Sequence, residues 1–250
     1  MADPRAVAAA VKGPVGILGG GFMVSREAKV FTERTGLPGW TAYFRGRCGV
    51  LGEVDADVVT ASTVFFPAEY VRDNWEAGRG LPVDEAVAAF ADACQEWGRR
   101  RFGGFAGTAR LAALTELVVD NADVIGAPLF AGWRAVPLAA DAPARLSQLL
   151  HTLRELRGGL HAVAVLGQGI HPLQAALAAD HDTPMGRREG EAQARFSAWP
   201  EPFPDITPEV IELRAKAEEI TDDLIAPAFE ILDEGEAGEL IGLLEQALAP

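Results

Sequence analysis

Apolar residues in the second half of the chain recur at spacings of three and four, the period of a helix with one buried face. In Ala144–Leu156 that face consists of Leu146, Leu149, Leu150, Leu153 and Leu156. Gly158–Gly159 follows, and glycine often ends a helix because it accepts the left-handed conformation. We therefore expect a helix that stops at this glycine pair, a second over Leu160–Gln168, and a third over Pro172–Ala179.

The C-terminal segment carries clear helix signals. Thr207 can cap free N–H groups, Pro208 suits a first helical turn, and Glu209 favours the positive end of the helix dipole. The apolar stripe predicted for this helix is Val210, Leu213, Ala217, Ile220 and Leu224. A last helix, after Asp233–Gly235, presents Leu240, Ile241, Leu243, Leu244 and Leu248.

Between these helical regions, Asp180–Asp205 is polar, with a short helix expected around Arg187–Phe196. The prolines of Trp199–Pro204 exclude a central strand or helix there.

The first half gives weaker patterns. Helices are expected over Ala6–Lys12, Ser25–Arg34 (with Ser25 as the cap), Val83–Arg100 and Gly107–Val119, whereas periodicity leaves Val54–Phe66 open between helix and strand. Glycines at 13, 16 and 19–21 match no phosphate-binding pattern, so we expect a broken helix that leaves room for a ligand or a neighbouring backbone. With no repeat and no linker, residues 1–250 should form one mostly α-helical unit, with an N-terminal helical half (1–140) and a C-terminal half (141–250).

Charge narrows the functional classes. The chain has 22 Lys and Arg against 36 Asp and Glu, a formal charge of −14. Such a surface disfavours nucleic acid and anionic membranes, and Arg99–Arg101 is expected to be a solvated helix end. The two cysteines, Cys48 and Cys94, form no CxxC pattern, and the N-terminus does not resemble a signal peptide, so a reducing cytoplasmic location is expected.

Arg157 and His161 are the sharpest candidates for chemistry. A guanidinium and an imidazole facing one cavity could hold a carboxylate or phenolate, or move a proton, which makes them the predicted catalytic pair. The alternative is that they bond the carbonyls of a helix end. Arg45 and Arg47 would share one side of an extended segment and, with Trp40, form a cationic and aromatic wall for a planar anion. Their alternative role is ion pairing at the surface.

An apolar pocket needs aromatic lining as well. The predicted ligand-binding aromatic residues are Phe22, Phe44, Phe65, Phe66, Trp75 and Trp133. The four histidines lack metal-ligand spacing, and no dinucleotide or nucleophile motif occurs, so neither a metal nor a cofactor is expected. His151 and Glu155, four residues apart, are interpreted as a surface pair of structural type.

Two motifs carry a family resemblance. The segments Trp40–Gly52 (WTAYFRGRCGVLG) and Leu153–His161 (LRELRGGLH) resemble signatures of the actinobacterial SalK-like helix-turn-helix family. Ile206–Leu224 is similar to the helix that closes winged-helix regulators of the MarR type. Gly159-Leu160 stands where the family motif has Asp-Gly, and Gly19–Met23 lacks the family's histidine, which indicates a divergent member with an altered pocket.

The resemblance implies a winged-helix-like fold that no longer binds DNA. In one form of this fold, two pseudo-repeated halves share one core. The expected function is binding, with transformation left open, of an anionic or aromatic small metabolite in specialised metabolism. The alternative is a ligand-responsive MarR-type transcriptional regulator, which needs a basic wing within Asp180–Asp205. There Arg187, Arg188 and Arg195 are offset by acidic neighbours. A third alternative is a purely structural partner protein. The ligand, the reaction and the oligomeric state, a homodimer included, are not determined by the sequence.

Overall fold

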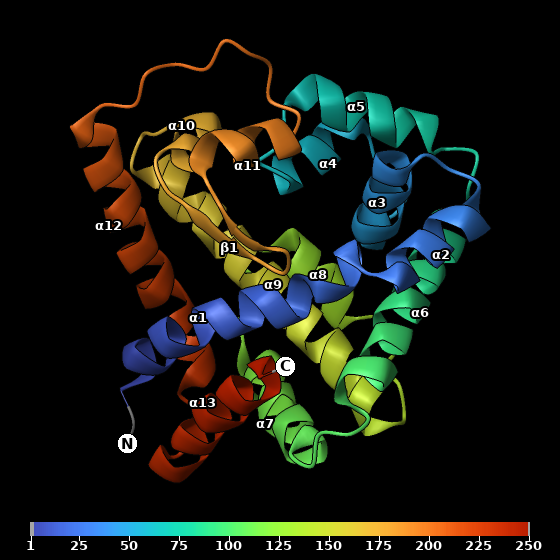
Figure 1. The fold of residues 1–250 in the computed structure, drawn as a ribbon, viewed down its shortest axis with the longest axis vertical. Coiled ribbons are helices and arrows are strands. Elements are labelled where there is room, and N and C mark those ends of the chain that lie inside the picture. Colours follow the sequence, from blue (N-terminus) through green and yellow to red (C-terminus); the bar gives the residue numbers. More distant parts are fainter. Residues whose placement is uncertain (1–2, 250) are drawn as a thin grey trace.

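Helix α9 (Ala142–Gly167) runs through the middle of the molecule, and helices from both halves of the chain pack around it (Figure 1). The computed structural model describes residues 3–249, and these form thirteen α-helices, three short 3-10 helices and one two-stranded hairpin. The mostly α-helical fold class is confirmed.

The elements before α9 are α1 (Pro4–Gly20), η1 (Gly21–Val24), α2 (Arg26–Thr35), α3 (Gly39–Cys48), η2 (Gly49–Leu51), α4 (Ala56–Ser62), α5 (Ala68–Ala77), α6 (Val83–Phe102), α7 (Thr108–Asn121) and α8 (Pro128–Arg134). Those after it are α10 (Pro172–Leu177), β1 (His181–Thr183), β2 (Gly186–Arg188), α11 (Gly190–Phe196), α12 (Pro208–Ile225), η3 (Ala226–Phe229) and α13 (Glu234–Leu248).

The leucine face predicted for α9 is the centre of the core. Its five leucines are almost fully buried, in one cluster with apolar side chains of α1, α6, α7 and α13. Residues before and after position 140 therefore share this cluster, while the division into two halves stays a prediction. Helix α9 packs against α1, α6, α7, α8 and α12.

The expected break at Gly158–Gly159 is wrong, because α9 continues through both glycines to Gly167. A Cβ atom on Gly159 would lie 2.8 Å from the Cα of Ala127, so this glycine permits close approach of the chain that enters α8. A Cβ atom on Gly158 would meet nothing within 4 Å. The packing of α9 against its neighbouring helices, with close contact at Gly159, thus overrides the weak helix preference of glycine.

Helix α1 is longer than expected and contains the glycines at 13, 16, 19 and 20 that were expected to break it, whereas Gly21 begins η1. A Cβ atom on Gly19 would lie 2.4 Å from the Leu150 carbonyl oxygen, so Gly19 lets α1 approach the backbone of α9. Among the described residues, Pro4–Val24 is the one segment long and apolar enough to span a membrane. In this structure α1 contributes Val7, Val11, Val15 and Leu18 to the main core, so its apolarity serves packing.

Two further predictions are corrected, and the choice left open at Val54–Phe66 is decided. Trp40–Arg47 is not extended but forms most of α3, and the ambiguous Val54–Phe66 contains helix α4, whose cap is Asp55. The helix expected over Arg187–Phe196 begins only at Gly190, because residues 186–188 pair with β1.

Leu224, expected on the buried stripe of α12, is 40% exposed. The side chains of Arg214, Thr221 and Asp222 are buried on that helix instead, because one face of α12 meets a polar cluster described below. The cap predicted at Ser25 is confirmed by its acceptance of two N–H groups, and Thr207 caps α12 as expected.

Candidate functional site

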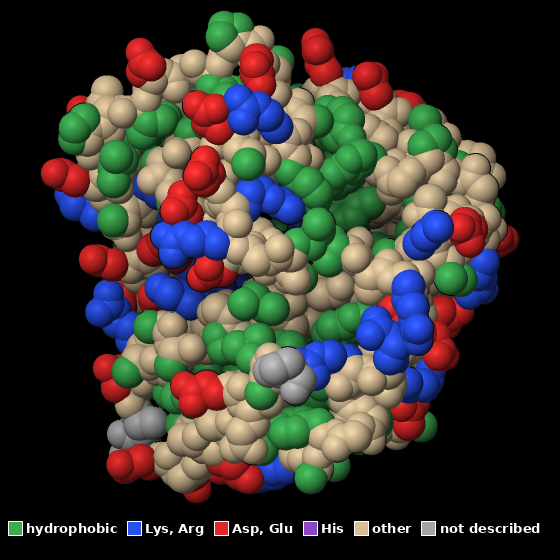
Figure 2. All heavy atoms as spheres, viewed as in Figure 1, with side chains coloured by type: hydrophobic (Ala, Val, Ile, Leu, Met, Phe, Trp, Pro, Cys, Tyr) green, Lys and Arg blue, Asp and Glu red, His purple; other side chains and the backbone are tan. Residues whose placement is uncertain are grey.

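A cavity of about 1030 Å³ lies between α1, α3, α9, the hairpin, α11 and α12. Figure 2 shows hydrophobic side chains gathered in a hollow on this face of the molecule. The aromatic residues that line the cavity are Trp40, Tyr43, Phe65, Phe66 and Phe196. Lys and Arg supply seven of the described lining residues, whereas Asp and Glu supply four. The cavity is therefore formally cationic inside a strongly acidic chain.

One face of α9 forms a wall of this cavity. Arg154, Gly158 and His161 follow at spacings of four and three, which places them on the same side of the helix. Gly13 and Gly16 of α1 also line the cavity, and Cβ atoms on them would meet nothing within 4 Å. The missing side chains of these glycines therefore add to the open space.

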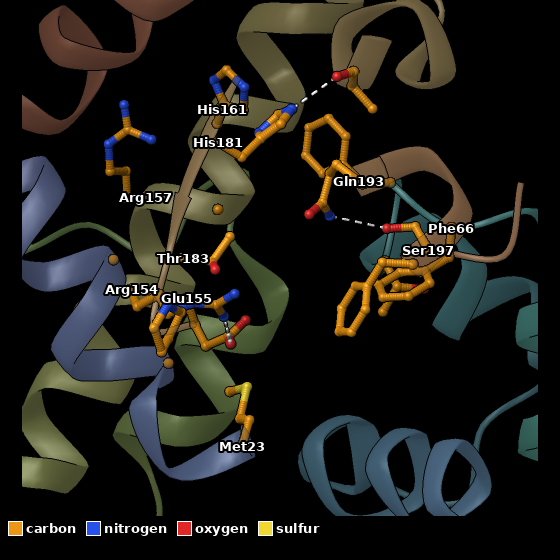
Figure 3. A pocket seen from close by; sticks show the side chains of 18 of the residues that line it. Met23, Phe66, Arg154, Glu155, Arg157, His161, His181, Thr183, Gln193 and Ser197 are labelled. Carbon is orange, nitrogen blue, oxygen red and sulfur yellow. Dashed lines mark hydrogen bonds and ion pairs between the residues drawn. The ribbon is translucent and has the colours of Figure 1, made fainter. Parts of the chain in front are cut away.

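Glu155 is the centre of a buried charge cluster at one end of the cavity (Figure 3). Arg47 donates to it through Nε at 2.9 Å and a terminal nitrogen at 2.6 Å, and Arg154 donates at 3.1 Å. Burial acts to raise the pKa of Glu155, but the charge of Arg47 overcomes it and holds that pKa at about 2. Two guanidinium groups thus share one carboxylate, which leaves this end positive.

His151 and Glu155 are not the surface pair that was expected. Both side chains are 1% exposed, and His151 Nδ1 lies 3.8 Å from Glu155 Oε1. Neither ring nitrogen of His151 has a hydrogen-bond partner among the described residues. The histidine is a core residue that contacts aromatic rings.

A second polar cluster joins α9 to α12. Glu218 accepts from Arg157 and, at 2.7 Å, from Arg214, while Asp222 pairs with Lys12 at 3.0 Å. Burial acts to raise the pKa of Glu218, but Arg157 and Arg214 hold it at about 2. Arg157 is therefore tied to α12 by an ion pair.

His161 lies at the other end of the α9 face, close to His181 in Figure 3. Its Nδ1 lies 2.9 Å from Thr221 Oγ1, and its ring stacks on Phe65 with centroids 5.5 Å apart. Burial, with a smaller effect from Arg214, lowers the pKa of His161 to about 3. The imidazole is therefore neutral at neutral pH.

Of the residues predicted from sequence, those that line the cavity are Trp40, Arg47, Phe65, Phe66, Arg157 and His161. The predicted residues outside the lining are Phe22, Phe44, Arg45, Trp75 and Trp133, all of which are buried. Helix α3 separates the two arginines, because residues two apart on a helix do not face the same way.

Arg45 donates to the Leu81 carbonyl at 2.7 Å, pairs with Glu53 and lies over Trp75. Sequence reasoning missed Arg154, Tyr43 and Phe196 as lining residues. For Arg154 the signal was its position seven residues before His161.

The arginines near the hairpin have partners within the described chain. Arg187 pairs with Asp180, and Arg195 pairs with Glu191 and Glu201. Arg188 lies over the ring of Phe196 at 4.0 Å. The hairpin turn itself, at Pro184 and Met185, lines the cavity, and a Cβ atom on Gly20 of α1 would lie 3.6 Å from Pro184. The hairpin thus forms part of the cavity wall.

Comparison with known proteins gives one family match. No curated protein and no solved structure matches the chain. A family model described as a helix-turn-helix family matches residues 15–249, which is nearly the whole chain. The protein therefore belongs to this helix-turn-helix family.

Proposed function

We propose that this protein is a divergent, SalK-like member of its family whose cavity binds an anionic small molecule with an aromatic or other apolar body. The observation that carries the proposal is the excess of Lys and Arg over Asp and Glu among the described lining residues of a chain with formal charge −14. Because the rest of the chain carries a net negative charge, an anion gains the most favourable electrostatic energy in the cavity.

Electrostatic attraction inside the cavity is stronger than at the surface. Interactions between charges grow as the effective dielectric falls, and aromatic walls exclude water from part of this space. Trp40 contacts Phe66 and Phe196 with ring centroids 5.5 Å and 5.2 Å apart, so rings from three separate segments form one wall. Ligand sites commonly combine such apolar walls with a few charged groups and reach about 1,000 Å³.

The second candidate function is that of a ligand-responsive regulator that binds DNA. The family description and the hairpin that follows α10 favour it. Against it, the arginines of the hairpin and of α11 are already engaged by carboxylates and a ring. Phosphate contacts need free cations, since counterion release supplies most of the affinity. We therefore favour ligand binding without specific duplex binding, in a reducing cytoplasm suited to two buried free cysteines. A homodimer stays a prediction.

The test fills the cavity without unfolding the protein. Gly158→Leu projects a side chain into space where nothing lies within 4 Å, and removal of a helical glycine favours the helix by up to about 1 kcal/mol. Gly242→Leu on α13 is the matched control, because it lies in a helix, has the same free space and does not line the cavity.

Mass spectrometry of the natively purified protein identifies the molecules bound to each variant. We expect small acidic molecules with the wild type and Gly242→Leu, and none with a folded Gly158→Leu variant. Equal occupancy in all three proteins, or none in any of them after incubation with a library of aromatic carboxylates, contradicts the proposal.

A further inference from the structure

The cavity wall on α9 has different chemistry at its two ends. His161 lies seven positions after Arg154, which is about 10 Å along a helix that rises about 1.5 Å per residue. Arg154 is a cation, His161 is neutral, and Gly158 between them carries no side chain. A molecule lying along this face would meet these three groups in order.

At the first end, Arg154 has hydrogen-bonding capacity left over. Within residues 3–249, its one hydrogen bond runs from a terminal nitrogen to Glu155, and that carboxylate is already bonded twice by Arg47. Nε and the second terminal nitrogen of Arg154 have no hydrogen-bond partner among residues 3–249. The side chain is one-third exposed and lines the cavity, so these donors are accessible to an anionic group.

At the second end, the hydrogen bonds fix the tautomer of His161. The Thr221 hydroxyl has one hydrogen, which it donates to the Ala217 carbonyl at 2.6 Å. The contact between Thr221 Oγ1 and His161 Nδ1 must therefore be donated by the ring, so Nδ1 carries the hydrogen. The free lone pair is then on Nε2, whose distance to Glu218 Oε1 is 3.9 Å, too long for a hydrogen bond.

A lone pair on Nε2 accepts a hydrogen bond from a ligand, and it is poorly placed to take the proton away. An imidazolium would be buried beside Arg157 and Arg214, both of which disfavour the charged ring, although Glu218 favours it. The neutral ring thus recognises a ligand hydroxyl or N–H group that keeps its proton. This differs from the proton transfer expected from the sequence.

We propose that the cavity takes an elongated ligand along α9, with its anionic group on Arg154, its apolar body over Gly158 and a hydroxyl or N–H group that donates to His161 Nε2. This inference rests on the proposed function and narrows it to one ligand class. Phe65, stacked on His161, and Phe66 flank the donor end of the ligand.

The experiment uses three probes and calorimetry on the full chain. The first probe, 4′-hydroxybiphenyl-4-carboxylate, has a carboxylate at one end and a hydroxyl at the other. In 4′-methoxybiphenyl-4-carboxylate the donor is removed, and in 4-hydroxybiphenyl the anion is removed. We expect the wild type to bind the hydroxy acid about five- to tenfold more tightly than the methoxy acid, the usual effect of one hydrogen bond.

The variants assign each end to a residue. His161→Phe keeps a ring to stack on Phe65, and leaves Thr221 still bonded to Ala217, so it should fold and bind the two acids equally. Arg154→Gln should weaken both acids at least about tenfold and leave 4-hydroxybiphenyl unchanged. Arg187→Gln, whose arginine is exposed and outside the cavity lining, is the matched control and should bind as the wild type does.

The outcomes separate the two proposals. In one outcome, the acids need Arg154 to bind, but the wild type does not prefer the hydroxy acid. This result overturns the proposed orientation of the ligand along α9 and leaves the anion site on Arg154 intact. A preference that persists in His161→Phe also overturns it. Failure of every probe to bind the folded wild type overturns the elongated-ligand inference, while acidic molecules retained by the native protein would still support the proposed function.

Discussion

His151 should make the stability of this protein fall steeply in mild acid. Its ring lies among Phe22, Phe90 and Trp133, with centroid distances of 5.2, 5.8 and 4.7 Å. Burial is the main cause of a pKa lowered from 6.5 to about 3, and the nearby charge of Glu155 only partly offsets it. In the unfolded chain the same imidazole is solvated and titrates near 6.5.

The sign and size of the effect follow from these two pKa values. Between pH 6.5 and 3 the unfolded state binds the proton and the folded state does not, so the free energy of unfolding falls as pH falls. At pH 5 the loss relative to neutral pH is about 2 kcal/mol for His151, from about 1.4 kcal/mol per pH unit. His161, with a similar pKa, adds a comparable loss. Glu155 and Glu218 contribute in the same direction only below about pH 4.5.

The substitution that isolates this effect is His151→Phe. Phenylalanine has a similar ring for the surrounding aromatic side chains, and it removes two buried nitrogens that have no partner. We expect unchanged or slightly higher stability at pH 7, and about 2 kcal/mol less loss between pH 7 and pH 5 than in the wild type. Urea unfolding at pH 7, 6 and 5 measures both quantities.

Two results would refute this reasoning. One is a pH dependence in His151→Phe equal to that of the wild type, since the buried imidazole would then contribute nothing. The other is a loss of several kcal/mol at pH 7, which would mean that His151 makes hydrogen bonds in the folded state. His171→Asn serves as the control, because His171 is an exposed helix cap and asparagine also caps helices.

Three other predictions follow from the contacts. Glu155→Gln leaves the buried charge of Arg47 without its carboxylate, so the free energy of unfolding should drop by about 3–5 kcal/mol in urea titrations, whereas a loss below about 1 kcal/mol would contradict the buried ion pair. Gly19→Ala pushes a methyl group against the Leu150 carbonyl and should lower the free energy of unfolding by about 1–3 kcal/mol. Gly16→Ala, with free space around it, should be neutral or stabilising. Equal shifts of the melting temperature in the two variants would refute the distinction. The protein should show no nanomolar binding to its own promoter in gel-shift assays at physiological salt, and tight binding that weakens steeply with salt would reverse this conclusion.

Local signals were read correctly where the structure depends on local chemistry. The leucine face of α9 and the caps at Ser25 and Thr207 were predicted because spacing and capping act within a few residues. The aromatic residues were harder, because a bulky ring suits a core and a ligand cavity equally. Phe65 and Phe66 line the cavity, whereas Phe44 and Trp75 lie in a separate buried cluster. Only the packing of helices distant in sequence determines which ring lies in the core and which in the cavity.

The glycine pair in α9 shows how one local error hid a site residue. The expected break placed Arg157 at the end of one helix and His161 at the start of the next, and the prediction paired these two residues. Because α9 continues, Arg154 and His161 share one face two turns apart, and Arg157 turns toward the carboxylates of α12. Gly159 lets the continuous helix contact the backbone before α8, and Gly158 leaves open space beside it. Helix propensity disfavours both glycines in the interior of a helix, so the feature that makes α9 hard to predict is the same one that opens the cavity.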